Sequence, residues 1–169
     1  MRAVIYRPAQ IVGRAQGSPH DLFDHALHVC KTLQTIPDIE AKIDMVTSDY
    51  VAAAIYALST QESSLGRAFH LVHPEPVSLR HFAGLFPMPL PIVPLNFWLA
   101  SLNHEARHRD DPSLHFVSLL TQGLERDELT PPGFDCSGTI AGLHGTGVVC
   151  PPLDRQFIQR ELASPEELR

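Results

Sequence analysis

The sequence lacks the features that mark nucleic-acid-binding, secreted and membrane-spanning proteins. Its 13 lysines and arginines are scattered and the formal net charge is −6, so no basic surface for nucleic acid is expected. No stretch approaches the roughly 18 uninterrupted apolar residues of a membrane helix, and the opening Met-Arg-Ala-Val-Ile-Tyr-Arg-Pro is too short for a signal peptide. We therefore expect a cytoplasmic protein with neither a nucleic acid nor a membrane as partner.

Cysteine is also scarce. Cys30, Cys136 and Cys150 are an odd number, widely spaced, and contain no Cys-x-x-Cys pair. This pattern predicts neither a disulfide framework nor a zinc knuckle, and we expect all three thiols to be reduced.

What is present indicates one α/β protein or part of a larger one, because 169 residues with 44% hydrophobic content can bury a core. Apolar runs with β-rich composition predict extended segments, and helical spacing between capping residues predicts helices. The expected extended segments are 4–6, 43–46 and 68–72, and the expected helices are 18–34, 50–59, 78–85, 95–108, 112–126, 135–143 and 151–162.

Two local features set expectations about side chains. Ser48-Asp49 is predicted to cap the helix that follows, so Asp49 is interpreted as an N-cap carboxylate rather than a catalytic one. His70 lies within an apolar strand and is interpreted as a hydrogen-bonded core histidine rather than a proton donor.

Five motifs recur in the order and spacing of a known family. The first is an Ile-Tyr-Arg-Pro strand with a following Ile and Gly, matched here by 5–13. The next are an Asp-Tyr-Val segment, matched by 49–51, and a Phe-His-Leu-Val segment, matched by 69–72. The last are a Trp, matched by Trp98, and a Cys-Pro-Pro-x-Asp segment, matched by 150–154. The chain thus resembles the C-terminal part of the thioester reductase domains. These are extended short-chain dehydrogenase/reductases that end nonribosomal peptide and polyketide assembly lines and carboxylic acid reductases. It departs from the pattern at Ala9, Ser48 and His73, which suggests a divergent or degenerate copy.

The resemblance implies an α/β fold in which the last elements of a Rossmann-like parallel sheet precede a mainly helical C-terminal subdomain. Residues 1–76 would be the remainder of the NADP-binding domain, with a helical insertion at about 18–35. Residues 77–169 would be the subdomain that receives the substrate and the carrier protein.

The implied activity is NADPH-dependent release of an acyl or peptidyl chain, held on a phosphopantetheinyl carrier protein, as an aldehyde or alcohol. Pro8, Ala9 and Ile11 match the family's backbone contact with the nicotinamide of NADPH; the alternative is that Pro8 only ends a strand and Ile11 fills a core. The sequence has no Gly-rich turn for the pyrophosphate and no Tyr-x-x-x-Lys pair, because neither Lys31 nor Lys42 follows a tyrosine at that spacing. We therefore assign no catalytic residue, and expect the chain to depend on an N-terminal Rossmann half and to bind no NADPH alone.

Two other functions stay open. The chain can be a non-catalytic module that binds a carrier protein or another partner. It can also be a zinc hydrolase, since His104-Glu105-x-x-His108 has zincin spacing, although charged neighbours and the lack of a marked third ligand argue against a metal site. Gly142-Leu-His-Gly145-Thr-Gly147 resembles a dinucleotide loop, but it follows a predicted helix and is interpreted as a helix C-terminal turn.

Overall fold

The computed structural model describes residues 3–13, 22–86, 88–122 and 133–162, and these form two compact units. The sheet unit comprises, of the described residues, 3–13, 43–77 and 133–162; the helical unit comprises 22–42, 78–86 and 88–122. The chain passes between the units within β4 (Lys42–Ile43) and β7 (Val77–Ser78). The α/β class with parallel strands, predicted from the sequence, is confirmed.

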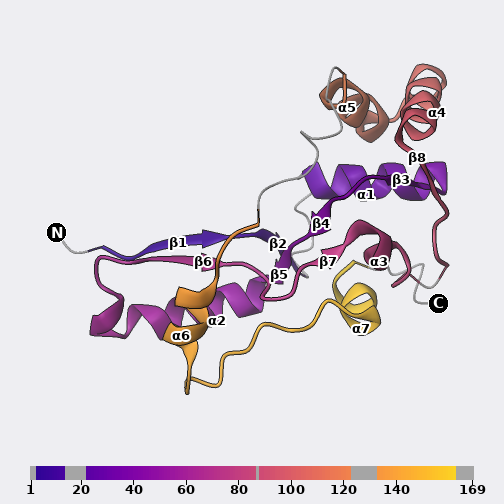
Figure 1. Cartoon of the computed structure of the whole chain (residues 1–169). Helices are drawn as coiled ribbons and strands as arrows, with labels where there is room; N and C mark the ends of the chain where they lie inside the picture. The colour runs from indigo at the N-terminus through magenta and orange to yellow at the C-terminus, as the bar shows by residue number, and fades with distance from the viewer. Residues whose placement is uncertain (1–2, 14–21, 87, 123–132, 163–169) are drawn as a thin grey trace. The chain divides into compact units, whose positions relative to one another are not determined.

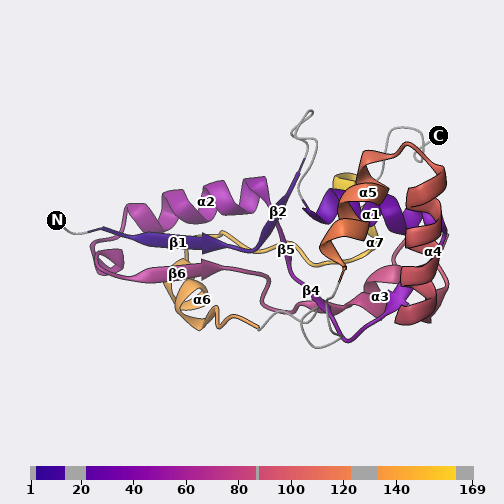
Figure 2. The same cartoon turned by 90° about the horizontal axis from the view of Figure 1, so that it is seen from above.

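The sheet unit contains two pairs of parallel strands with helices beside them (Figures 1 and 2). Its elements are β1 (Ile5–Pro8), β2 (Gln10–Val12), β5 (Met45–Thr47), α2 (Ser48–Ser59), a 3-10 turn (Glu62–Ser64), β6 (Ala68–Leu71), α6 (Ser137–Leu143), α7 (Arg155–Phe157) and a π turn (Ile158–Leu162). In β1 and β6, Ile5 pairs with Ala68 and Pro8 with Leu71, while β2 pairs with β5 from Gln10 opposite Met45 to Val12 opposite Thr47.

One face of the β1–β6 pair carries the core of this unit. Tyr6 stacks on Phe69, and both belong to a cluster with Leu71, with apolar residues of α2 and with Leu143 of α6. Because side chains alternate across a strand, Ile5 and Arg7 point to the opposite face, where Ile5 is 51% exposed. Among the described residues, β1 is therefore covered on one face only.

The two edges of the β1–β6 pair differ. Ile5 N–H donates to Arg67 and Ala9 N–H to Leu71, so alternate amides of β1 face β6, and the N–H and C=O of Tyr6 face the other way. No described strand pairs with that edge of β1. The outer edge of β6, by contrast, is covered by α6, since the Thr139 hydroxyl donates to the His70 carbonyl at 2.7 Å.

The helical unit encloses a core between its helices. Its elements are α1 (Leu22–Leu33), β3 (Ile36–Asp38), α3 (Leu79–Ala83), β8 (Ile92–Pro94), α4 (Leu95–His108) and α5 (Pro112–Leu120). Val29, Trp98, Leu102 and Leu114 pack together, and the Trp98 indole donates to the Thr35 carbonyl. The parallel pairing of β3 with β8 was not predicted, because Ile36-Pro37-Asp38 resembles only the end of a helix.

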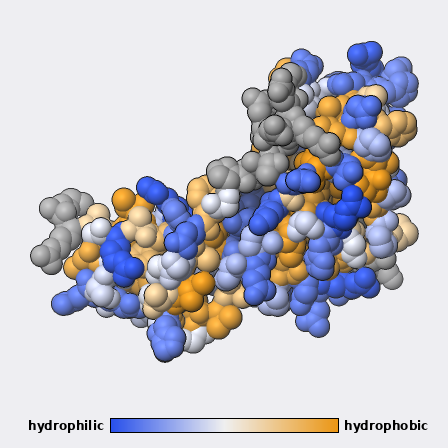
Figure 3. Space-filling model, in the orientation of Figure 1, coloured by the Kyte–Doolittle hydropathy of each residue, from blue (hydrophilic) through white to orange (hydrophobic). Residues whose placement is uncertain are grey.

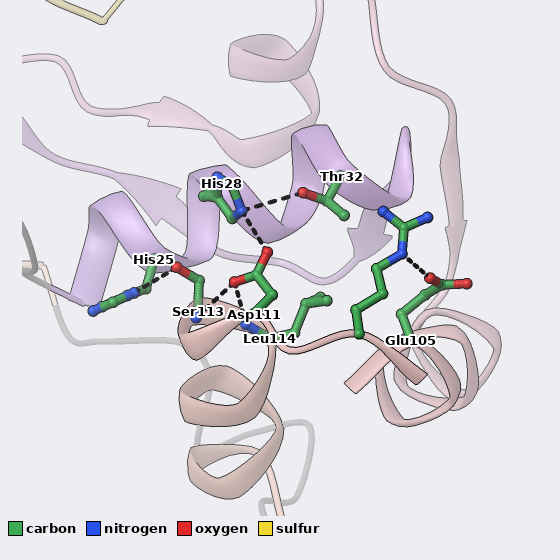
Figure 4. A network of polar contacts seen from close by, with 8 residues as sticks. His25, His28, Thr32, Glu105, Asp111, Ser113 and Leu114 are labelled. Carbon is green, nitrogen blue, oxygen red and sulfur yellow. Dashed lines mark hydrogen bonds and ion pairs between the residues drawn. The ribbon is translucent and has the colours of Figure 1, made fainter. Parts of the chain in front are cut away.

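Polar contacts join α1 to the start of α5 (Figure 4). The Asp111 carboxylate accepts hydrogen bonds from the backbone N–H of Ser113 and Leu114, and it contacts His28 Nε2 at 2.8 Å. His25 Nδ1 lies 2.8 Å from the Ser113 hydroxyl. Burial opposes ionisation of Asp111, but these hydrogen bonds outweigh it and lower the pKa of the carboxyl.

The compact units divide the chain differently from the ranges 1–76 and 77–169, and the assignment of these ranges to a cofactor domain and a substrate domain stays a prediction. The described residues of 133–162 belong to the sheet unit, where Leu143 packs with Phe69 and Leu71. Those of 22–38 belong to the helical unit, where Val29 packs with Trp98. Side-chain packing, and not position along the chain, decides to which unit each of these segments belongs.

Two predicted helix starts need correction. The N-cap of α2 is Thr47, whose hydroxyl accepts from Tyr50 N–H, and Asp49 lies in the first turn. The last helix begins after Asp154, which accepts from Phe157 N–H, and not at Pro151. In both cases the residue whose side chain can reach a free N–H three positions later is the cap. The predicted start at Ser18 to Asp21 lies outside the described residues.

Candidate functional site at the carboxyl ends of the parallel strands

The candidate site begins where β1 ends. Pro8 is the last residue of β1, Ala9 donates its N–H to the Leu71 carbonyl at 3.1 Å, and Gln10 then starts β2, which pairs with β5. The chain therefore changes its partner strand at Ala9. Ligands of open α/β sheets bind outside the carboxyl ends of the strands, which makes this edge the place to search for a site.

The three predicted cofactor-binding residues lie in this one segment. Pro8 is exposed, Ala9 is half-buried against the core of the sheet unit, and Ile11 is 42% exposed. Pro8 offers a carbonyl without an N–H, and Ile11 offers an accessible apolar surface. Their contact with nicotinamide stays a prediction.

Gly13 brings the end of β2 against the start of α2. A Cβ at this position would lie 2.6 Å from Ser48 Oγ, and the backbone φ of +154° is one that other residues rarely adopt. The Ile-x-Gly pattern noted in the sequence thus corresponds to a close backbone approach at this edge.

His73 fixes the loop after β6. Its backbone N–H donates to Asp44 at 2.8 Å, its Nδ1 accepts from Glu75 N–H at 3.0 Å, and its Nε2 lies 3.1 Å from the Pro151 carbonyl. Because Nδ1 must accept and the carbonyl cannot donate, the ring is neutral with its proton on Nε2. Burial raises the pKa of Asp44, although the hydrogen bond from the backbone N–H of His73 opposes the rise. The sequence had flagged His73 only as a departure from the family pattern.

His70 is half-buried and hydrogen-bonded. Its Nδ1 lies 3.1 Å from the Asp135 carbonyl and its Nε2 lies 3.3 Å from an Arg7 nitrogen. The Phe134 ring meets it edge-on at 5.4 Å. The expected hydrogen bonding is present, but the ring lies on the face opposite Phe69 and not in the core.

The zincin-like motif lies on exposed turns of α4. Glu105 pairs with Arg109 at 2.5 Å, and His108 Nδ1 lies 2.7 Å from the His104 carbonyl, a geometry in which the ring nitrogen donates. In the described part of the chain, no three His, Cys, Asp or Glu side chains are grouped closely enough to hold a metal ion. The turn after α6 matches its prediction, with Gly145 and Gly147 at φ of +77° and +78°.

The three cysteines are free, as predicted. Burial raises the pKa of the Cys30 and Cys150 thiols to about 12 and raises that of Cys136 less far. Among the described residues, no helix has the length and apolar character needed to cross a membrane.

Comparisons with known proteins agree with the motifs. The chain is 28% identical to the non-canonical nonribosomal peptide synthetase FrzA of a Cladobotryum species, over 94% of the chain and 17% of FrzA. The crystal structure of the terminal R domain from the myxalamid PKS-NRPS pathway superposes with a TM-score of 0.80 at 28% identity, over 94% of this chain and 42% of that one. The chain is similar to the C-terminal portion of terminal reductase domains.

A second solved structure shares the fold. The thiolation-reductase di-domain of an archaeal nonribosomal peptide synthetase matches with a TM-score of 0.69 at 19% identity, over 93% of this chain and 34% of that one. No family profile matches the chain. The chain spans less than half the length of each of these three proteins, so their activities are not transferred to it as findings.

Proposed function

We propose that the chain forms the later part of an NADPH-dependent thioester reductase and acts together with a preceding N-terminal Rossmann half. The observation that carries the proposal is the outer edge of β1, with which no described strand pairs. The similarity to a part, 42%, of a terminal reductase domain supports it. A parallel strand of an α/β protein is ordinarily flanked and covered, and Ile5 and the backbone of Tyr6 are positioned to be flanked by further strands.

The described residues fit one end of the cofactor. Pro8, Ala9 and Ile11 offer backbone and apolar surface to a nicotinamide ring at the carboxyl end of the sheet. The start of α2 does not suit the pyrophosphate, because Thr47 already accepts the Tyr50 N–H and Asp49 adds negative charge in the first turn. Under this proposal, the phosphate-binding loop and the Tyr-x-x-x-Lys pair come from the preceding half.

The proposed partner is a carrier protein that presents a thioester. When bound, NADPH would supply a hydride to the thioester carbonyl, which with one proton gives an aldehyde and the free carrier thiol; a second hydride and proton would give the alcohol. The contribution of this chain is to complete the sheet, to support the nicotinamide and to present a substrate path. A non-catalytic carrier-binding module is the alternative if no reductase half completes the sheet.

The test compares the chain alone with one polypeptide in which the upstream part of a terminal reductase domain, such as the terminal R domain of the myxalamid PKS-NRPS pathway, precedes it. We expect the joined polypeptide to bind NADPH and to form aldehyde from a carrier-bound thioester, and the chain alone to do neither. Ile11→Asp should weaken NADPH binding by the joined polypeptide, whereas Ile140→Asp, at a 54% exposed position on α6, should not. Thioester reduction by the chain alone would contradict the proposal.

A further inference from the structure

An open pocket of about 380 Å³ lies beside the first two turns of α2. Ala53, Val148 and Val149 supply apolar walls, and Tyr50 also lines the pocket. It adjoins the candidate site, because Thr47, the last residue of β5, and Pro151, which His73 contacts, are also among its lining residues. The volume lies within the range of small-molecule sites.

Tyr50 brings a buried hydroxyl to this pocket, and this hydroxyl has no hydrogen-bond partner among the described residues. Its side chain is 7% exposed, and no hydrogen bond to its hydroxyl occurs among the described residues. Every fully enclosed side-chain nitrogen or oxygen among those residues is bonded, so the Tyr50 hydroxyl reaches solvent. Tyr6, in contrast, bonds Ser59 at 2.8 Å. Buried tyrosine hydroxyls ordinarily have a partner, and this hydroxyl is accessible either to water or to a ligand in the pocket.

The protonation state of this hydroxyl and the charges around it restrict the ligand. Burial raises the pKa of Tyr50 to about 12, so the group is an O–H donor at neutral pH. Two carboxylates, Asp49 and Glu161, line the pocket, and the Arg160 guanidinium is bonded to Glu161 at 2.6 Å. The pocket therefore disfavours an anionic ligand, and its apolar walls suit an uncharged chain that carries a hydrogen-bond acceptor.

We propose that this pocket binds a secondary amide of an uncharged chain, with the Tyr50 O–H donating to the amide carbonyl and Val148 and Val149 contacting the chain. The inference rests on the proposed function, which supplies two sources of such amides: the pantetheine arm of a carrier protein and a peptidyl chain. Tyr50 is then a specificity-determining residue of the substrate path, outside the hydride-transfer machinery.

The experiment measures binding to the full chain by NMR chemical-shift titration, with pantetheine in one arm and N-acetyl-dialanine methylamide in the other. Tyr50→Phe removes only the hydroxyl and should weaken binding roughly three- to tenfold, the value of one hydrogen bond. Tyr56→Phe is the matched control, because Tyr56 lies on the same helix with 75% exposure and should leave binding unchanged. Ala53→Trp fills the pocket from an exposed wall position and should abolish binding without altering Tyr50.

Binding of either probe with this pattern of variants supports the proposal and identifies the source of the amide. No binding of either probe, or equal binding by the wild type and Tyr50→Phe, would overturn it. The assay needs neither NADPH nor turnover, so its failure is separate from failure of the reductase proposal. If the joined polypeptide reduced thioesters but the chain bound neither amide, only the proposal for the pocket would be wrong.

Discussion

The helical unit and the sheet unit cover their apolar cores in different ways. In the helical unit, α1, α4 and α5 enclose Val29, Trp98 and Leu102 between them. In the sheet unit, α2 and α6 cover one face of β1 and β6, while the outer backbone of β1 has no described partner. Helices pair most of their own backbone groups, whereas a strand leaves backbone donors and acceptors unpaired along any edge that has no neighbour. Under the proposed function, the open edge of β1 is where a strand of the preceding half pairs.

Exposed apolar residues occur on both units (Figure 3), so exposure alone does not separate them. Leu119 on α5 is 65% exposed and Phe134 in the sheet unit is 57% exposed. The difference lies in the elements that build the core: strands β1 and β6 contribute to the core of the sheet unit, whereas helices dominate that of the helical unit, whose β3–β8 pair also lacks further described partner strands.

The largest effect is expected in the helical core. Leu102→Ala removes a fully buried side chain between α1, α4 and α5 and should lower the free energy of unfolding by about 3–5 kcal/mol. Trp98 is the only tryptophan, so its fluorescence during urea unfolding reports this unit alone. Leu119→Ala, on an exposed face of α5, should change stability by no more than about 0.5 kcal/mol. Equal effects of the two variants would show that this core is not the packed unit described.

A smaller loss is expected where α6 meets α2 and β6. A Cβ on Gly142 would lie 2.6 Å from Leu58 and 3.2 Å from Phe69, so Gly142→Ala should cost about 1–3 kcal/mol by overpacking. Gly138→Ala is the control on the same helix, because its Cβ would meet only the Arg67 guanidinium at 3.6 Å. The control should be neutral or stabilising, and far-UV circular dichroism during denaturation measures both. A stabilising Gly142→Ala would contradict the close packing of α6.

The cap of α5 should show a pH dependence. The lowered pKa of Asp111 means that its ionised form stabilises the folded state above the ordinary aspartate pKa of 3.8, and that this stability is lost as the pH falls through the folded value. Asp111→Ala should cost about 1 kcal/mol at pH 7 and almost nothing once the wild-type carboxyl is protonated. Thermal unfolding of both proteins across this pH range tests it, and a constant difference at all pH values would contradict it.

The smallest predicted effect concerns the thiols. Because burial raises the pKa of Cys30 and Cys150 to about 12, both should react with iodoacetamide at pH 8 more slowly than Cys136, which is itself slower than a free cysteine. Peptide mapping of the alkylated chain gives the order. Fastest labelling of Cys30 would contradict the packing around α1.

Much of this architecture follows from local sequence. The caps at Ser78 and Asp111, the extent of α4 and the glycine turn after α6 depend on residues close in the chain, and such signals can be read directly. The pairing of β3 with β8 could not be found this way, because it joins residues more than 50 positions apart through short segments without a clear period.

One part of the candidate site could likewise be predicted from local sequence, and another part could not. The motif around Pro8 to Gly13 predicted that segment as a unit, and the structure places it at the carboxyl edge of the strands. The Tyr50 pocket was missed, since its walls come from α2, the turn at 147–149 and the chain's last described turn. The only local signal was a tyrosine one residue after an acidic helix start. That signal cannot show whether the hydroxyl finds a partner.

The most direct test of the central claim is amide hydrogen exchange at Tyr6, measured in the chain alone and in the joined polypeptide. The account predicts fast exchange at Tyr6 in the chain alone and strong protection once a neighbouring strand pairs with β1. The amides of Ile5 and Ala9, which already donate to Arg67 and Leu71, should be protected in both and act as internal controls. Equal protection of Tyr6 in the two proteins, or an unprotected Tyr6 in a joined polypeptide that reduces thioesters, would contradict the account.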